Sequence, residues 1–169
     1  MLLTGQYFHA FDAKWRLTIP AKLREQINRS EDCYAFMASY SFDGILYLYT
    51  PNTYRNVSPQ FNPALRTVED VRDYERLTYG TTQRMELDRL GRILLPEHTR
   101  QQLGLSREVA IVGVRDHIEI WDRERWQTFV QERLKNHNEL AKRAMAAAGA
   151  SVAAGAEEAE IEESAGNST

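Results

Sequence analysis

The segments DAKWRLTIP, residues 12–20, and DRLGRILLP, residues 88–96, decide the architecture of this protein. Asp, Arg and Pro recur in them at the same three places, and the offset between the copies is 76 residues throughout. A second pair of segments, residues 43–49 and 116–121, repeats in the same order with one residue of slippage. Ordered matches of this kind indicate an internal duplication, so we expect two related halves.

Each copy has the pattern of a strand, a charged turn, a second strand and a short helix. In the first copy, residues 7–11 alternate like a half-buried strand, and residues 17–19 follow the turn as a second strand. Pro20 suits the first turn of a helix that ends near Asn28, because its missing N–H is unpaired there in any case. The second copy repeats the scheme, with Gly104 as the left-handed residue after its helix.

Each copy then returns to strand as a hairpin, around residues 43–44 in the first and 115–117 in the second. Thr50–Pro51 and Asp122 are the expected caps of the helices that close the two copies. Halves of this size have thin cores alone, so they should share one core. We therefore predict an α+β domain with a pseudo-two-fold, β-barrel-like core, whose central sheet or barrel interleaves strands from both copies.

The predicted organisation has five parts. They are a first half over residues 5–54, a bridging helix over 60–79, a second half over 80–126, a C-terminal helix over 127–143 and a disordered acidic tail over 144–169. Apolar residues from Trp126 to Ala141 fall near one face of the C-terminal helix. That face either packs on the body or forms a contact between copies of the chain. The tail has no large apolar surface to bury.

Composition gives a mixed signal about partners. The formal net charge of −3 does not suggest a nucleic-acid binder, but the tail carries five glutamates and no Lys or Arg, so the rest of the chain is mildly basic. Cys33 is the only cysteine, which excludes an intramolecular disulfide. No signal peptide or membrane-length apolar run is visible, so we expect a soluble cytoplasmic protein with no membrane partner.

The repeated Asp-x-x-x-Arg segment is the candidate functional site. The Asp can pair with the Arg or accept backbone N–H groups, which stiffens the turn and fixes a guanidinium that can read guanine or clamp a phosphate. The plain alternative is a surface ion pair that contributes under ~1 kcal/mol and has no further role. Recurrence in both copies favours a symmetric ligand such as double-stranded DNA. The predicted turn-stabilising residues are Asp12 and Asp88, and the predicted DNA-binding residues are Lys14, Arg16, Lys22, Arg24, Arg89 and Arg92.

These residues resemble the MraZ family. The resemblance rests on GQYFHAF at residues 5–11 followed by DAKWRLTIP, on the later DGILYLY, and on MELD followed by RLGRILLP. It implies two SpoVT-AbrB-type swapped-hairpin domains and a transcriptional regulator near the start of the division and cell-wall gene cluster. It also implies ring-shaped homo-oligomers, associated with the nucleoid, that bind short direct repeats in promoter DNA through Arg16, Lys14 and Arg92.

The first copy departs from the family pattern at one position. Glycine usually precedes the motif Arg, as Gly91 does here, but the first copy has Trp15. A turn that requires positive φ would be strained by tryptophan. Either the first turn has a different form, or Trp15 is a DNA contact or an anchor between subunits.

Other function classes have weaker support. The four histidines are dispersed without metal-ligand spacing and no glycine-rich phosphate loop is present, so we expect no enzyme activity, cofactor, metal or small-molecule substrate. The main rival is an oligomeric scaffold or interaction protein with incidental DNA binding. An antitoxin-like partner is disfavoured by the duplicated single-chain architecture and the absence of an obvious toxin-binding arm.

Overall fold

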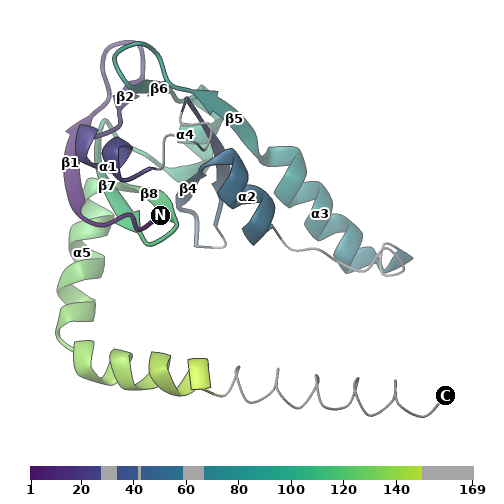
Figure 1. The fold of residues 1–169 in the computed structure, drawn as a ribbon, viewed down its shortest axis with the longest axis vertical. Coiled ribbons are helices and arrows are strands. Elements are labelled where there is room, and N and C mark those ends of the chain that lie inside the picture. Colours follow the sequence, from purple (N-terminus) through teal and green to yellow (C-terminus); the bar gives the residue numbers. More distant parts are fainter. Residues whose placement is uncertain (28–33, 42, 59–66, 150–169) are drawn as a thin grey trace. The chain divides into compact units, whose positions relative to one another are not determined.

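A computed structural model describes residues 1–27, 34–41, 43–58 and 67–149. It divides into two compact units, Met1–Trp126, which we call the body, and Gln127–Thr169. The described strands of the body form a six-stranded sheet and a separate two-stranded ribbon, with short helices beside them (Figure 1). The strands are β1 (Gln6–Ala10), β2 (Arg16–Thr18), β3 (Ala35–Tyr40), β4 (Leu46–Tyr49), β5 (Gln83–Glu86), β6 (Arg92–Leu94), β7 (Glu108–Val114) and β8 (His117–Asp122). The helices are α1 (Ala21–Gln26), α2 (Pro51–Val57), α3 (Glu69–Thr81), α4 (Glu97–Leu103) and α5 (Arg123–Leu134).

The sheet interleaves the two copies with pseudo-two-fold symmetry. Its strand order is β1-β7-β8-β4-β3-β5, so the first strand of each copy pairs with the hairpin of the other. At the centre Tyr47 pairs with Glu119, and in the ribbon Leu17 pairs with Ile93. These pairs join equivalent positions of the two copies, which places the pseudo-two-fold axis between them. The predicted α+β fold of two interleaved copies is confirmed.

The barrel-like closure expected from the sequence is not formed by the described strands. β1 and β5 are the two edges of the sheet and pair only on one side each. The strands that follow them, β2 and β6, leave the sheet and pair with each other. Because each copy places its second strand in this ribbon, the described sheet remains open and the ribbon does not pair with its strands.

Local signals in the sequence account for most of the element boundaries. The Thr50 hydroxyl accepts a hydrogen bond from the Thr53 N–H at 3.2 Å, and Pro51 opens α2, as predicted. The Asp122 carboxylate accepts from the Glu124 N–H at 3.0 Å at the start of α5. Gly104 ends α4 with φ of 61°. Helix α1 ends at Gln26, and the predicted end near Asn28 lies outside the described residues.

The ribbon and the sheet share one apolar core. Leu17 and Ile93, which face inward at the centre of the ribbon, are fully buried. They join Leu23 of α1 and alternate residues of the sheet strands, among them Ile111 and Ile118. Side chains alternate between the two faces of a strand. The opposite face of the sheet buries a smaller cluster, Ile45, Ala110, Val112 and Trp121. The ribbon therefore has one buried face, and its other face is left exposed.

Three further helical segments lie around or after the second half of the chain. Helix α3 covers the later part of the predicted bridging helix, and residues 60–66 lie outside the described chain. Helix α5 begins within the second half, and none of its side chains is buried. A further helical stretch covers residues 137–149, so helix extends past the predicted start of the tail at Ala144; residues 150–169 are not described. No described helix is both long and apolar enough to cross a membrane.

Candidate nucleic-acid interface

The first Asp-x-x-x-Arg segment is a tight turn between β1 and β2 that is held by Asp12. One carboxylate oxygen accepts the backbone N–H groups of Lys14 and Arg16 at 2.9 and 3.0 Å. The other accepts the Arg16 Nε–H at 2.7 Å. The Trp15 N–H donates to the Asp12 carbonyl at 2.9 Å and closes the turn. Asp12 therefore fixes both the loop backbone and the direction of the Arg16 side chain.

The second segment, between β5 and β6, repeats this geometry bond for bond. Asp88 accepts the backbone N–H groups of Leu90 and Arg92 at 2.9 and 3.0 Å and the Arg92 Nε–H at 2.7 Å. The Gly91 N–H donates to the Asp88 carbonyl at 2.9 Å. Each turn is thus held by hydrogen bonds to its own aspartate.

The two motif arginines differ in how much of the guanidinium is already used. Arg16 bonds to Asp12 through Nε, and its side chain is 33% exposed. Arg92 bonds to the same Asp88 oxygen through Nε and through Nη2 at 2.6 Å, and its Nη1 lies 3.7 Å from Asp12. Because Arg92 also approaches the carboxylate of the other copy and is only 21% exposed, Arg16 is the more accessible of the two to a ligand.

Of the alternatives for Trp15, a different form of the first turn is wrong. Trp15 has φ of 58° and Gly91 has φ of 72°, so both occupy the left-handed region at the same place. This conformation costs a residue with a side chain roughly 1–2 kcal/mol. The Trp15 ring, half-buried against the core, packs on Phe11 with ring centroids 5.4 Å apart. Packing of this large ring offsets the backbone strain.

Each turn is also tied to the other copy. The Ile19 N–H donates to the Gly91 carbonyl at 2.9 Å, and the Leu95 N–H donates to the Trp15 carbonyl at 3.1 Å. These bonds extend the ribbon at both ends and hold the two turns on one scaffold. In Figure 1 the β1–β2 and β5–β6 loops project together at the top of the body.

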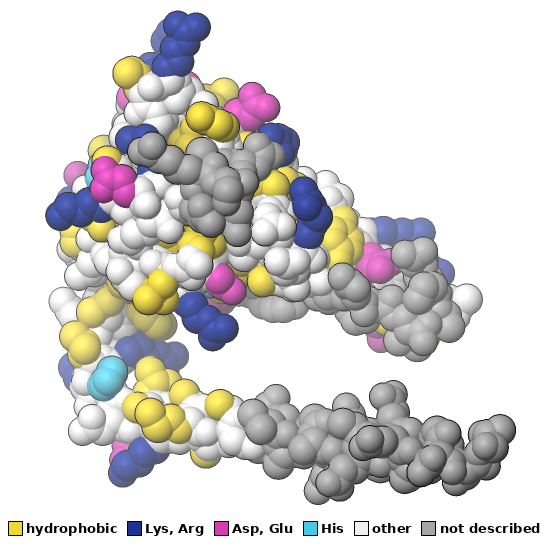
Figure 2. Space-filling model, viewed as in Figure 1, with side chains coloured by type: hydrophobic (Ala, Val, Ile, Leu, Met, Phe, Trp, Pro, Cys, Tyr) yellow, Lys and Arg dark blue, Asp and Glu magenta, His cyan; other side chains and the backbone are white. Residues whose placement is uncertain are grey.

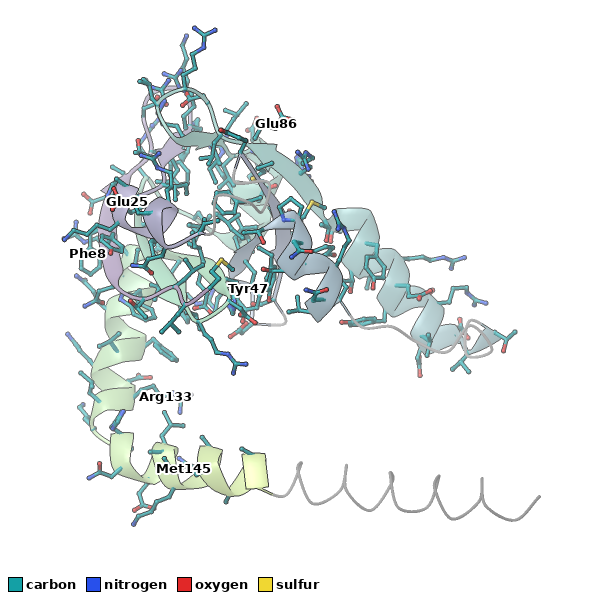
Figure 3. The ribbon with its side chains drawn as sticks, viewed as in Figure 1. Phe8, Glu25, Tyr47, Glu86, Arg133 and Met145 are labelled. Carbon is teal, nitrogen blue, oxygen red and sulfur yellow. The ribbon has the colours of Figure 1, made fainter. Side chains whose placement is uncertain are left out.

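The other predicted cations surround these turns without carboxylate partners among the described residues. Lys14 and Arg89 are exposed within the turns, and Lys22 is exposed on α1. Arg24 is half-buried, and its Nε–H donates to the Ile19 carbonyl at 3.1 Å. Figure 2 shows Lys and Arg side chains at the top of the body, over the two loops. In Figure 3 the acidic Glu25 and Glu86 lie below the loop tips. Since each motif Arg is neutralised by its Asp, these cations supply the positive charge of the surface.

Two further cations, which were not among the predicted DNA-binding residues, lie against the first turn. The Arg100 and Arg107 guanidinium carbons lie 3.7 and 4.3 Å from the centroid of the Trp15 ring. The sequence could have pointed to Arg100, because Arg100 recurs at the repeat offset from Arg24. It could not have pointed to Arg107, because Arg107 bonds to Asp12, which is 95 positions away in the chain.

The hydrogen bonds of the second turn predict that Asp88 stays ionised at a lower pH than an ordinary aspartate. The Arg92 side chain and backbone N–H groups lower the pKa of Asp88 from 3.8 to about 2. A lowered carboxyl pKa stabilises the fold fully above the unfolded value, and this contribution is lost as pH falls through the folded value. We expect Asp88 to remain ionised at pH 3 in a carboxyl-detected NMR titration, and Arg92→Gln to raise its midpoint. A wild-type midpoint near 3.8 would contradict the hydrogen-bonded form of the turn.

A separate cavity lies away from this surface in the described part of the chain. A cavity of about 580 Å³ beside β3, β4, α2 and α3 shares no residue with either turn. Its lining is rich in tyrosine, and burial and the nearby Asp116 raise the pKa of Tyr49 to about 12. Within the described ranges, no group of three or more His, Cys, Asp or Glu side chains is placed to hold a metal ion.

Comparison with known proteins assigns the chain to a family. The family described as "MraZ protein, putative antitoxin-like" matches residues 2–76 and 78–147. A protein named transcriptional regulator MraZ from Lactiplantibacillus plantarum is 36% identical over 82% of this chain and 94% of its own length. One of the same name from Heliobacterium modesticaldum is 32% identical over 84% of this chain and 96% of its own length. The duplicated turns and the extent of these matches lead to one conclusion: the chain belongs to the MraZ family.

Proposed function

We propose that this protein is a transcriptional regulator that binds specific promoter DNA as a homo-oligomer. The observation that carries the proposal is the pair of turns in which Asp12 and Asp88 fix Arg16 and Arg92 beside cations that have no carboxylate partner among the described residues. The names of its relatives point to the same role. By its family resemblance, its targets are short direct repeats near the division and cell-wall gene cluster, and its location is the nucleoid-associated cytoplasm.

The exposed face of the ribbon has the chemistry to read base edges. Leu17 and Ile93 point into the core, so Arg16, Thr18, Arg92 and Leu94 share the outer face. A two-stranded ribbon fits the major groove of B-DNA, where Arg recognises guanine and apolar groups contact the thymine methyl. Leu94 is 60% exposed on this face, which suits such an apolar contact.

Oligomer formation compensates for the small number of cations in one subunit. A strong DNA-binding protein makes about six to ten phosphate contacts, and much of the charge on the motif arginines is already neutralised. Repeating the same turns around a ring multiplies weak contacts along repeated sites, which raises avidity without strengthening any one of them. This is the reason that direct repeats are the fitting target.

Selection of bound genomic fragments with the full-length protein tests the proposal. We expect fragments with a shared short repeat to be enriched, and binding to weaken steeply between two salt concentrations as counterions are released. Size-exclusion chromatography under the same conditions checks the oligomer. Salt-insensitive assembly with no enriched sequence would instead support the scaffold function, because contacts between apolar surfaces do not weaken with salt in this way.

A further inference from the structure

The two turns are not equivalent, although their backbone hydrogen bonds match. Pseudo-symmetry makes Gly91 the counterpart of Trp15, and Arg24 the counterpart of Arg100. The Phe11 N–H donates to the Arg107 carbonyl as the Leu87 N–H donates to the Tyr34 carbonyl, so Tyr34 is the counterpart of Arg107. The first turn therefore has an aromatic ring with two arginines against it, where the described residues of the second turn have a glycine with Arg24 against it.

The first turn is filled by a stack of cations on an aromatic ring. Arg100 lies with its guanidinium carbon 3.7 Å from the Trp15 centroid, and Arg107 lies at 4.3 Å. Arg107 Nη1 also donates to the Asp12 carbonyl at 3.0 Å, which fastens it to the turn that holds Arg16. Stacking and this bond hold both guanidinium groups on the turn.

The corresponding space at the second turn is open among the described residues. A cavity of about 510 Å³ there is lined by Gly91, Arg24 and Tyr34, together with Glu25, Asp88 and Arg89 and two apolar neighbours. Arg24 folds back on Gly91 so closely that a Cβ there would lie 2.7 Å from its guanidinium carbon. Its Nε–H is satisfied by the Ile19 carbonyl. Arg24 is thus held against backbone, and Glu25 lies in the same cavity.

The charges of Arg100 and Arg107 are not neutralised in the described structure. Neither has an ion pair with a described carboxylate, and the buried Arg100 Nε–H has no hydrogen-bond partner there. A guanidinium stacked on a ring retains its in-plane N–H donors, and these match the oxygens of a phosphate. The stack therefore holds two cations on the turn that also carries Arg16.

We propose that Arg100 and Arg107, held on Trp15, form a phosphate-binding site for the DNA backbone at the first turn, with no counterpart among the described residues of the second turn. This rests on the proposed DNA-binding function and adds an asymmetry to it. Arg100 and Arg107 bind the ligand, and Trp15 is a positioning residue. In each subunit the first turn then binds the DNA backbone through Arg100 and Arg107, while the second turn has a cavity beside Arg89.

The salt dependence of DNA binding by the full-length protein tests this site. We expect Arg107→Gln and Arg100→Gln each to reduce the slope of log K against log salt by about 0.9 for every subunit on the DNA. Trp15→Gly should also lower the slope, while Trp15→Phe should keep it near wild type because a ring remains. Arg76→Gln, which removes an exposed charge paired with Asp73 on α3, is the matched control.

The possible outcomes distinguish a failure of the proposed phosphate-binding site from a failure of the proposed DNA-binding function. Reduced slopes for the Arg100 and Arg107 variants, with the control unchanged, support the site. Unchanged slopes in variants that still melt and assemble like wild type overturn it, while loss of binding by Arg16→Ala would leave the proposed function standing. Absence of salt-dependent DNA binding by the wild type itself would remove the function. Arg107 is exposed, so Arg107→Gln keeps the test decisive if Arg100→Gln does not fold.

Discussion

Arg16→Ala is expected to weaken specific DNA binding by about 5- to 150-fold, the range for removal of an arginine that reads a base. The Arg16 side chain is 33% exposed, against 21% for Arg92, so more of its guanidinium can reach the ligand. Alanine keeps the backbone N–H that Asp12 accepts, so the turn itself should persist. Gel-shift titration against a selected fragment measures the change in affinity, and size-exclusion chromatography should still show the oligomer.

Arg92→Ala is the informative comparison for this variant. All three Arg92 nitrogens face Asp88 or Asp12, so less of this side chain is available to DNA and a smaller decrease in affinity is expected. If Arg16→Ala binds DNA as tightly as the wild type, the first turn is not a DNA-binding site through Arg16. If Arg92→Ala lowers DNA affinity more than Arg16→Ala does, the second turn contributes more to binding than the first, contrary to this prediction.

Leu17→Ala is expected to destabilise the body by about 2–5 kcal/mol, as for other buried leucines replaced by alanine. Leu17 is fully buried and pairs with Ile93 at the pseudo-two-fold centre of the ribbon. The ribbon holds both turns and contributes its inner face to the shared core, so a cavity there affects both copies at once. With total stabilities of about 5–15 kcal/mol typical of natural proteins, this decrease is large. Chemical denaturation of the full chain, followed by tryptophan fluorescence, measures it.

Thr18→Ala provides the matched control on the same strand. Thr18 is the next residue of β2 and is exposed on the outer face, so its replacement should change stability within about 0.5 kcal/mol. A Leu17→Ala variant that unfolds at nearly the wild-type denaturant concentration would show that the ribbon is not an integral part of the core.

Local signals in the sequence predict the positions of several elements correctly. The Asp-x-x-x-Arg turns, the Thr50 and Asp122 caps and the left-handed Gly104 follow from hydrogen bonds between near neighbours. The alternation of residues 7–11 likewise predicts β1. The sequence does less well on closure of the sheet: the expected barrel-like core is an open sheet, because β2 and β6 pair with each other instead of joining its edges.

The sequence predicts the two turns of the candidate site. It does not predict the contacts that Arg92 and Arg107 make with Asp12 across the two copies. Asp12 and Asp88 were expected to stiffen the turns, and they do so with matched distances. The approach of Arg92 to Asp12 joins the two copies and could not be read from either one. The same holds for Arg107, whose bond to Asp12 spans 95 positions. Contacts between residues so far apart in the chain depend on how the two copies pair. Neither the composition nor the spacing of the residues shows that pairing directly.

The sequence by itself determined that there are two copies, that each carries a turn fixed by its own aspartate, and that a strand and a short helix follow. These features depend on residues a few positions apart, whose geometry the backbone limits strongly. Only the tertiary structure decided that β1 pairs with β7 and β5 with β3, that the ribbon has an exposed face, and that Trp15 gathers Arg100 and Arg107. The physical reason is that burial of the shared apolar core selects the pairing of the copies. That pairing brings together side chains that the chain order keeps apart.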